Sequence, residues 1–194
     1  MRRLFLIGCV LLFALTACAT TEDETTVLEL ERDISAEILG GTVTIDYPDG
    51  WLAQGTDDTI TFANREELLT PGFSARRGGD AAGGVTLVTP DALEIYAVSA
   101  DASITAIARA VAAVTFGDDD TITLRDPASF FVGEREGAVV SGSANTSEEI
   151  VGEVAVAVIE VETGYATIVV GSFDGDFVPG ELVEAIAASL QYEA

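Results

Sequence analysis

The stretch that decides the fold runs from Glu153 to Ser172 and reads EVAVAVIEVETGYATIVVGS. Its first half alternates Val with Ala and is rich in β-branched residues, and its second half is equally apolar. Thr163 and Gly164 stand between the two halves and are typical of a tight turn. The stretch therefore predicts a β-hairpin whose strands lie near the centre of a sheet.

Further strands are predicted upstream of this hairpin by alternating or short apolar runs. These runs cover residues 42–47, 59–63, 85–88, 121–124 and 138–144, and a weaker pattern begins at Val27. The strand at 42–47 stops at Pro48-Asp49-Gly50, where Pro and Gly favour a turn into Trp51. Residues 64–84 are rich in Gly and poor in apolar side chains, which predicts a long, mobile surface loop.

Two helices are indicated by apolar residues at helical spacing, one over 103–115 and one over 181–190. A shorter helix over 91–96, opened by Pro90, is also expected. Hairpins replace a regular alternation of parallel strands and helices in this order of elements. The sequence therefore predicts one α+β domain over residues 41–194, an antiparallel sheet packed against helices as a sandwich.

Charge and composition restrict the function. The chain of 194 residues has 33 acidic and 9 basic side chains, no His, and a formal charge of −24. Such a surface repels phosphate backbones, so nucleic acid is not expected as a partner. Without His, a Ser–His–Asp triad is excluded, and we expect a protein that is not an enzyme. The hydrophobic fraction of 48% is sufficient for a folded core.

The N-terminus has the features of a bacterial export signal. Arg2 and Arg3 precede an apolar stretch over 4–15, which is shorter than the roughly 20 residues that span a bilayer. The run Leu15-Thr16-Ala17-Cys18 resembles the bacterial lipobox. The resemblance implies a signal peptide over 1–17 and a Cys18 that carries diacylglycerol and an amide-linked acyl chain such as palmitate.

This N-terminus predicts a location as well as an anchor. Residues 18–40 are expected to be mostly a flexible acidic tether behind the lipidated Cys18. The domain would then lie in the bacterial cell envelope, anchored on the extracytoplasmic face of a membrane, with a membrane-complex protein as one class of partner. The alternative is an ordinary secretory signal that leaves Cys18 as a free thiol.

Two short motifs are similar to those of PsbP/Mog1-like proteins. They are Tyr47-Pro48-Asp49-Gly50-Trp51 and the helix end Ala187-Ala188-Ser189-Leu190, and the resemblance spans roughly residues 41–192. It implies an antiparallel sheet between a Pro-x-Gly-Trp turn and a final helix. It also implies an accessory or binding role, because the family brings no catalytic motif to this chain.

Three groups of residues are candidate sites. Tyr47 and Trp51 could form an aromatic platform for a ligand, or they could anchor the sheet over the core. Arg76 and Arg77 could bind a carboxylate or phosphate, or lie in a solvated loop. Acidic loop residues could bind a hard cation such as Ca²⁺, or they could form solvated turns. These residues are Asp118, Asp119, Asp120, Asp174 and Asp176.

The leading hypothesis is a membrane-anchored lipoprotein whose non-catalytic domain binds a partner protein or small ligand, with no cofactor. The second is a divalent-cation-binding domain that uses the acidic loops, which would make Ca²⁺ its ligand. The third is a hydrolase that works through carboxylates alone, since sequence does not report the separation of two carboxyl groups.

Overall fold

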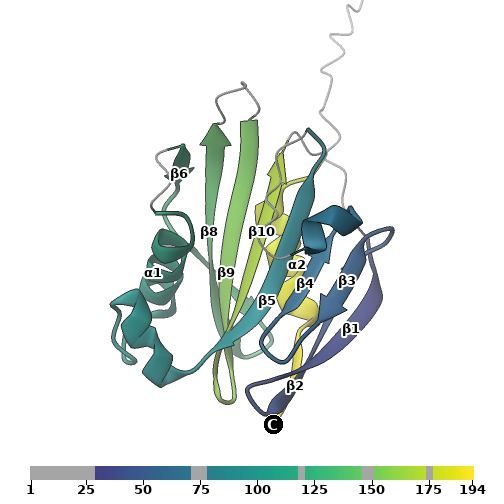
Figure 1. The fold of residues 1–194 in the computed structure, drawn as a ribbon. Helices are drawn as coiled ribbons and strands as arrows, with labels where there is room; N and C mark the ends of the chain where they lie inside the picture. Colours follow the sequence, from purple (N-terminus) through teal and green to yellow (C-terminus); the bar gives the residue numbers. More distant parts are fainter. Residues whose placement is uncertain (1–28, 71–77, 118–120, 146–150, 174–176) are drawn as a thin grey trace, which may run out of the picture.

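A computed structural model describes residues 29–70, 78–117, 121–145, 151–173 and 177–194 (Figure 1). Its first half contains β1 (Leu30–Ile38), β2 (Gly41–Pro48), β3 (Leu52–Gly55), β4 (Ile60–Ala63), the 3₁₀ helix η1 (Glu66–Leu69), β5 (Ala81–Val88), the 3₁₀ helix η2 (Pro90–Tyr96) and α1 (Ile104–Phe116). Its second half contains β6 (Ile122–Leu124), β7 (Ala128–Val132), β8 (Arg135–Asn145), β9 (Val151–Val161), β10 (Gly164–Phe173), α2 (Pro179–Ser189) and β11 (Gln191–Glu193).

The strands form two antiparallel sheets. The small sheet has the order β1-β2-β11, and the large sheet has the order β3-β4-β5-β10-β9-β8-β6, with β7 paired to β8. Helix α1 packs on β8 and β9, whereas α2 packs on β9, β10 and β2. The predicted fold class, an antiparallel α+β sandwich, is confirmed.

The predicted central hairpin is β9–β10, and both of its faces are buried. Val156 and Val158 point into the core under α1, while the alternating Ala155 and Ala157 point into the core shared with α2 and the small sheet. Strand side chains alternate between faces, so the larger Val side chains fill the core under α1 and the smaller Ala side chains fill the core on the side of α2. Figure 1 shows the hairpin in the middle of the large sheet, flanked by β8 and β5.

The predicted helices are also present. Helix α1 begins after Ser103, whose hydroxyl accepts a hydrogen bond from the amide of Ala106, and it buries Ile104, Ile107 and Val111. The short helix after Pro90 is a 3₁₀ helix. The turn before Trp51 is formed as expected, with Gly50 at a φ of 76° and the Trp51 amide bonded to the Pro48 carbonyl.

The predicted surface loop over 64–84 is wrong in part. Residues 66–69 form η1, and residues 81–84 are the first half of β5, inside the large sheet. A Cβ on Gly83 would come within 2.5 Å of both the Phe62 ring and the Val169 carbonyl oxygen. Gly83, one of the glycines that suggested a loop, is therefore needed where the Phe62 ring lies against the strand.

The boundary predicted for the tether is also wrong. Residues 30–38 lie within the predicted tether but form β1, which pairs with β2 along its length from Leu30 to Ile38. The main chain of β1 finds its hydrogen-bonding partner in the small sheet, so its exposed, polar side chains do not prevent strand formation. Strands β3, β7 and β11 were not predicted from the sequence.

Two glycines in adjacent strands provide a test of the close contact in β5. We expect Gly83→Ala to lower the free energy of unfolding by about 2 kcal/mol, because Phe62 and the Val169 carbonyl must move. Gly171→Ala should change it by less than about 1 kcal/mol, because its Cβ would meet only Val154, at 3.9 Å. Urea unfolding followed by Trp51 fluorescence measures both, and equal losses would contradict this account.

Candidate functional site

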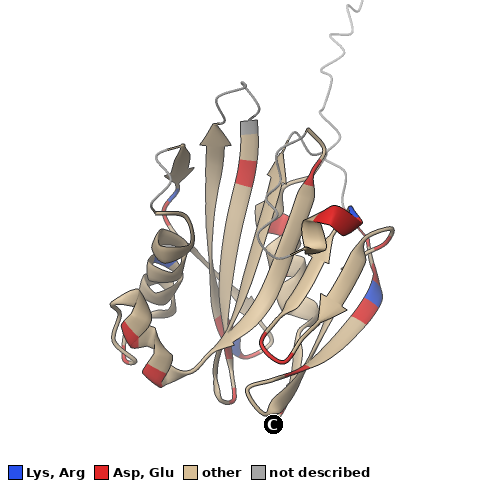
Figure 2. Ribbon diagram, viewed as in Figure 1, with Lys and Arg blue, Asp and Glu red and all other residues tan. Residues whose placement is uncertain are grey.

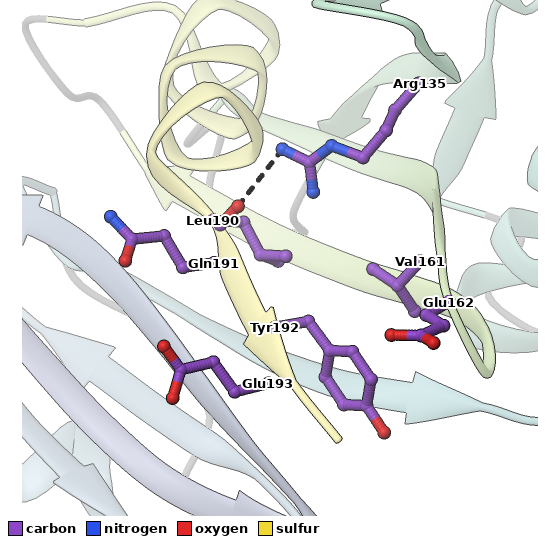
Figure 3. Close-up of a pocket in the computed structure, with 7 residues that line it drawn as sticks. All are labelled: Arg135, Val161, Glu162, Leu190, Gln191, Tyr192 and Glu193. Atoms are coloured by element: carbon purple, nitrogen blue, oxygen red, sulfur yellow. Dashed lines mark hydrogen bonds between the residues drawn. The ribbon is translucent and has the colours of Figure 1, made fainter.

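A cleft of about 340 Å³ lies at the seam between the two sheets. One wall is Leu190 and the three residues of β11, and the other is Arg135 at the start of β8 with Val161 and Glu162 at the end of β9 (Figure 3). This volume is at the lower end of the range for ligand sites, roughly 300–1,000 Å³. Because Glu193 lines it, the cleft lies close to the C-terminus, whose position Figure 1 marks.

Ser189 directs the chain into the first wall. Its hydroxyl donates to the Ile186 carbonyl, which ends α2, and accepts a 2.9 Å hydrogen bond from the amide of Asp46 in β2. Leu190 follows and is 2% exposed, so it anchors the chain in the core. The next residues then pair with β2 as strand β11, with Gln191 opposite Thr44.

Two side-chain hydrogen bonds connect β11 to the large sheet across the cleft. The Arg135 guanidinium donates a 3.0 Å hydrogen bond to the Leu190 carbonyl, and Thr163 donates a 2.9 Å bond to the Tyr192 hydroxyl. The Tyr192 ring also lies against Gly41, where a Cβ would come within 2.5 Å of its hydroxyl oxygen. These contacts fix both walls of the cleft.

The main-chain direction of β11 follows from its register. Thr42 and Thr44 pair with Glu193 and Gln191, and the amide of Asp46 points to the same side of β2, toward Ser189. In an antiparallel pair, alternate residues exchange the hydrogen bonds, so Gln191 and Glu193 bond to β2. The N–H and C=O of Tyr192 consequently face away from β2, on the side of the cleft.

The charge of the cleft is mixed. Arg135 is the cation among the residues that line it, and Glu162 and Glu193 are exposed carboxylates. In Figure 3 the Arg135 guanidinium points toward Leu190 and Glu162 lies on the same side of β11 as Tyr192, while the side chains of Gln191 and Glu193 point to the opposite side of the strand. Figure 2 shows other acidic positions of the described chain at strand ends, turns and short helices.

The two predicted aromatic residues lie elsewhere. Trp51 is 6% exposed and packs edge-on against Phe177 and at a tilt against Phe62, with ring centroids 5.7 and 6.1 Å away. This is the core-anchoring arrangement that the sequence left open. Tyr47 is half-buried at the edge of the same core, so neither residue lines the seam cleft.

The other predicted site residues lie outside the described residues. They are Cys18, Arg76, Arg77, Asp118, Asp119, Asp120, Asp174 and Asp176. Described residues that border two of these segments are in contact, because the Gly79 amide donates a 2.6 Å bond to the Phe173 carbonyl. Strand β10 begins at Gly164, which follows the hairpin residues that line the cleft, and it ends at Phe173. The contact between Gly79 and Phe173 therefore lies at the end of the large sheet opposite to the cleft.

Buried charge in the described chain is found at that opposite end. Asp80 is 2% exposed and forms an ion pair with Arg65, next to the start of β5. Asn64 bridges the same region, accepting from the Ala81 amide and donating to the Gly79 carbonyl. These polar groups hold η1, β5 and β10 together, which is a structural role.

One carboxyl group of α2 has a raised pKa. Partial burial, and secondarily the charge of Glu181 one turn earlier, raises the pKa of Glu184 above its ordinary value of 4.5. Glu184 does not line the seam cleft.

Within the described ranges, no three His, Cys, Asp or Glu side chains are grouped as metal ligands, and no helix has the length and hydropathy of a membrane span.

No family model and no curated protein matches this chain. Among solved structures it is similar to the solution structure of PsbP (CyanoP) from Synechocystis, at 9% identity and a TM-score of 0.45, over 77% of this chain and 85% of that one. It is also similar to a crystal structure from Bacteroides thetaiotaomicron, at 11% identity and a TM-score of 0.41, over 78% of this chain. The chain spans 45% of the length of that Bacteroides protein.

The cleft residues were not predicted as a site. Arg135, Glu162 and Tyr192 come from three separate segments, and none belongs to a motif. The one local signal was Ser189-Leu190, which marked the end of the last helix and here positions β11.

The hydrogen bond between Arg135 and Leu190 can be tested by removing its donor. Arg135→Met keeps an aliphatic chain of similar length, and we expect it to lower the free energy of unfolding by about 1–2 kcal/mol. Arg109→Met is the control, because Arg109 pairs with Asp126 on the surface. We expect this substitution to lower the free energy of unfolding by less than about 0.5 kcal/mol. Urea unfolding compares the two, and a neutral Arg135→Met would contradict a role in closing the seam.

Glu184 predicts a pH-dependent gain in stability. Its raised pKa means that the charged form is disfavoured in the folded chain, so Glu184→Gln should raise the Tm at pH 7. As the pH falls through the raised pKa, the wild type binds a proton and becomes more stable. The difference in Tm between Glu184→Gln and the wild type should therefore vanish below pH 4.5, the pKa in the unfolded chain. Thermal unfolding at pH 7 and below pH 4.5 measures this difference. An equal rise in Tm for Glu31→Gln would instead assign the effect to net charge.

Proposed function

We propose that this chain is a bacterial lipoprotein anchored through Cys18 on the extracytoplasmic face of a membrane, with a domain that binds a partner and catalyses no reaction. The observation that carries the binding role is the cleft at the seam, whose walls are fixed by hydrogen bonds from Arg135 and Thr163. The polar groups that cross it are engaged in holding the two sheets together. A fixed, open surface of this kind suits recognition.

Support for the anchor comes from the sequence. The basic start and the short apolar stretch are followed by the lipobox-like run, which ends at Cys18. Eleven residues separate Cys18 from Leu30, the first residue of β1. A single acyl chain binds membranes only marginally, whereas the two or three chains of a lipidated Cys make the anchor stable. The connecting residues include Glu22, Asp23 and Glu24, which keep the acidic domain away from an anionic leaflet.

The geometry of β1 favours a partner that approaches from outside the membrane. Leu30, where the described strand begins, lies six residues from Ala36, which is paired through Val43 to Tyr192 in the cleft wall. Six residues of strand span roughly 20 Å. The cleft is therefore separated from the point where the tether enters the domain by the length of the small sheet (Figure 1).

Site-specific crosslinking in intact cells tests this function. The chain has no Lys, so amine-reactive reagents are unsuitable, and a photoreactive phenylalanine analogue in place of Glu162, which is exposed and lines the cleft, is used instead. The matched control places the same group at Glu31, which is exposed at the far end of the small sheet. We expect one abundant partner to be captured from position 162 and not from position 31, as measured by quantitative mass spectrometry.

Cys18→Ala completes the experiment. The wild type should fractionate with membranes, and the variant should be released from them and lose the partner if that partner is itself in the membrane. A variant that stays in the membrane fraction would contradict lipid anchoring at Cys18. Equal capture from positions 162 and 31 would contradict binding of a partner at the cleft.

A further inference from the structure

The geometry points to recognition of an extended, basic peptide segment that adds as a strand to the free edge of β11. This inference rests on the proposed binding function and names the class of partner. It begins from the register of the small sheet, in which β11 pairs with β2 on one side and has no strand on its other side among the described residues. An edge of this kind is a template for another strand.

The main-chain groups of Tyr192 provide the attachment point. They face away from β2, because Gln191 and Glu193 are the residues bonded to Thr44 and Thr42. The neighbouring outward carbonyl, that of Leu190, is occupied by the Arg135 guanidinium. The free part of the edge is thus one residue long, which permits two main-chain hydrogen bonds and a short segment of partner.

The cleft walls supply the side-chain contacts. Val161 forms part of the opposite wall, and it packs against the same core as Leu190. Side chains of an incoming strand alternate, so one set would meet this apolar wall while the other meets the rim. A volume of about 340 Å³ restricts the occupant to a few residues.

Charge selects a basic segment. The exposed carboxylate of Glu162 stands on the cleft side of β11 and that of Glu193 on the opposite side of the strand, while the Arg135 guanidinium is turned to the Leu190 carbonyl (Figure 3). The whole chain has a formal charge of −24, so its field draws cations toward every open surface. Successive side chains of a strand point to opposite faces, so Lys or Arg on one face of the partner would meet Glu162 and Lys or Arg on the other face would meet Glu193, whereas acidic peptides would be repelled.

The test uses synthetic peptides and the full chain in detergent micelles. The probe is an end-capped Lys-Val-Lys-Val-Lys-Val peptide. Its controls are the Glu-Val-Glu-Val-Glu-Val peptide and two copies of the probe N-methylated at alternate residues, one copy for each register. We expect the probe to bind in a titration followed by amide NMR, the acidic peptide to show no binding, and N-methylation in one of the two registers to abolish it.

Amide exchange identifies the mode of binding. The amide of Tyr192 should exchange about tenfold more slowly when the probe is bound, while those of Gln191 and Glu193, already bonded to β2, should change little. Glu162→Gln should weaken binding about three- to fivefold, and Glu31→Gln, the same charge change at the far end of the small sheet, by less than about twofold.

Each failure has its own meaning. Binding of the probe without protection of Tyr192, or equal binding of the N-methylated copies, overturns strand addition. Equal effects of Glu162→Gln and Glu31→Gln overturn the role of the rim carboxylates. Capture of a partner through position 162 together with no binding of the basic probe overturns this inference and leaves the proposed binding function standing.

Discussion

The structure depends on the burial of the β9–β10 hairpin on both faces. Val156 and Val158 of β9 pack under α1, and Ala155 and Ala157 face the core shared with α2, so both helices pack against this strand. Burial of each such Val side chain contributes roughly 1.5–3 kcal/mol, and no other strand contacts both helices as extensively. Every other element, including the small sheet with its cleft, is positioned relative to this hairpin.

The small sheet is attached by few but specific interactions. Helix α2 carries the chain across the core, Ser189 fixes where it leaves the helix, and Arg135 and Thr163 bind β11 from the large sheet. Replacing any of these by an apolar residue would leave a main-chain or hydroxyl group without its partner. A polar set of this size is sufficient because Leu190 and the β2 residues Val43 and Ile45 supply the apolar burial.

Sequence patterns predicted the elements whose conformation is determined by residues close together in the chain. The helical spacing in α1 and the Val-Ala alternation in β9 each appear within a few residues, and both were recognised. Gly83 was misassigned because its strand position is explained by Phe62, twenty-one residues earlier, and not by its own sequence. The cleft could not be predicted, because Arg135, Glu162 and Tyr192 meet only when two sheets are assembled and a three-residue strand has no measurable periodicity.

The pairing of β11 with β2 has a consequence for how the chain folds. The bond from Asp46 to Ser189 joins residues 143 positions apart, whereas the β9–β10 hairpin closes locally. Loop closure becomes costlier by about 0.6 kcal/mol for each doubling of length, so this contact forms against the larger entropy loss. We infer that the hairpin nucleates and the seam is assembled last, which leaves β2 as an open edge during most of the folding reaction, when aggregation competes with it.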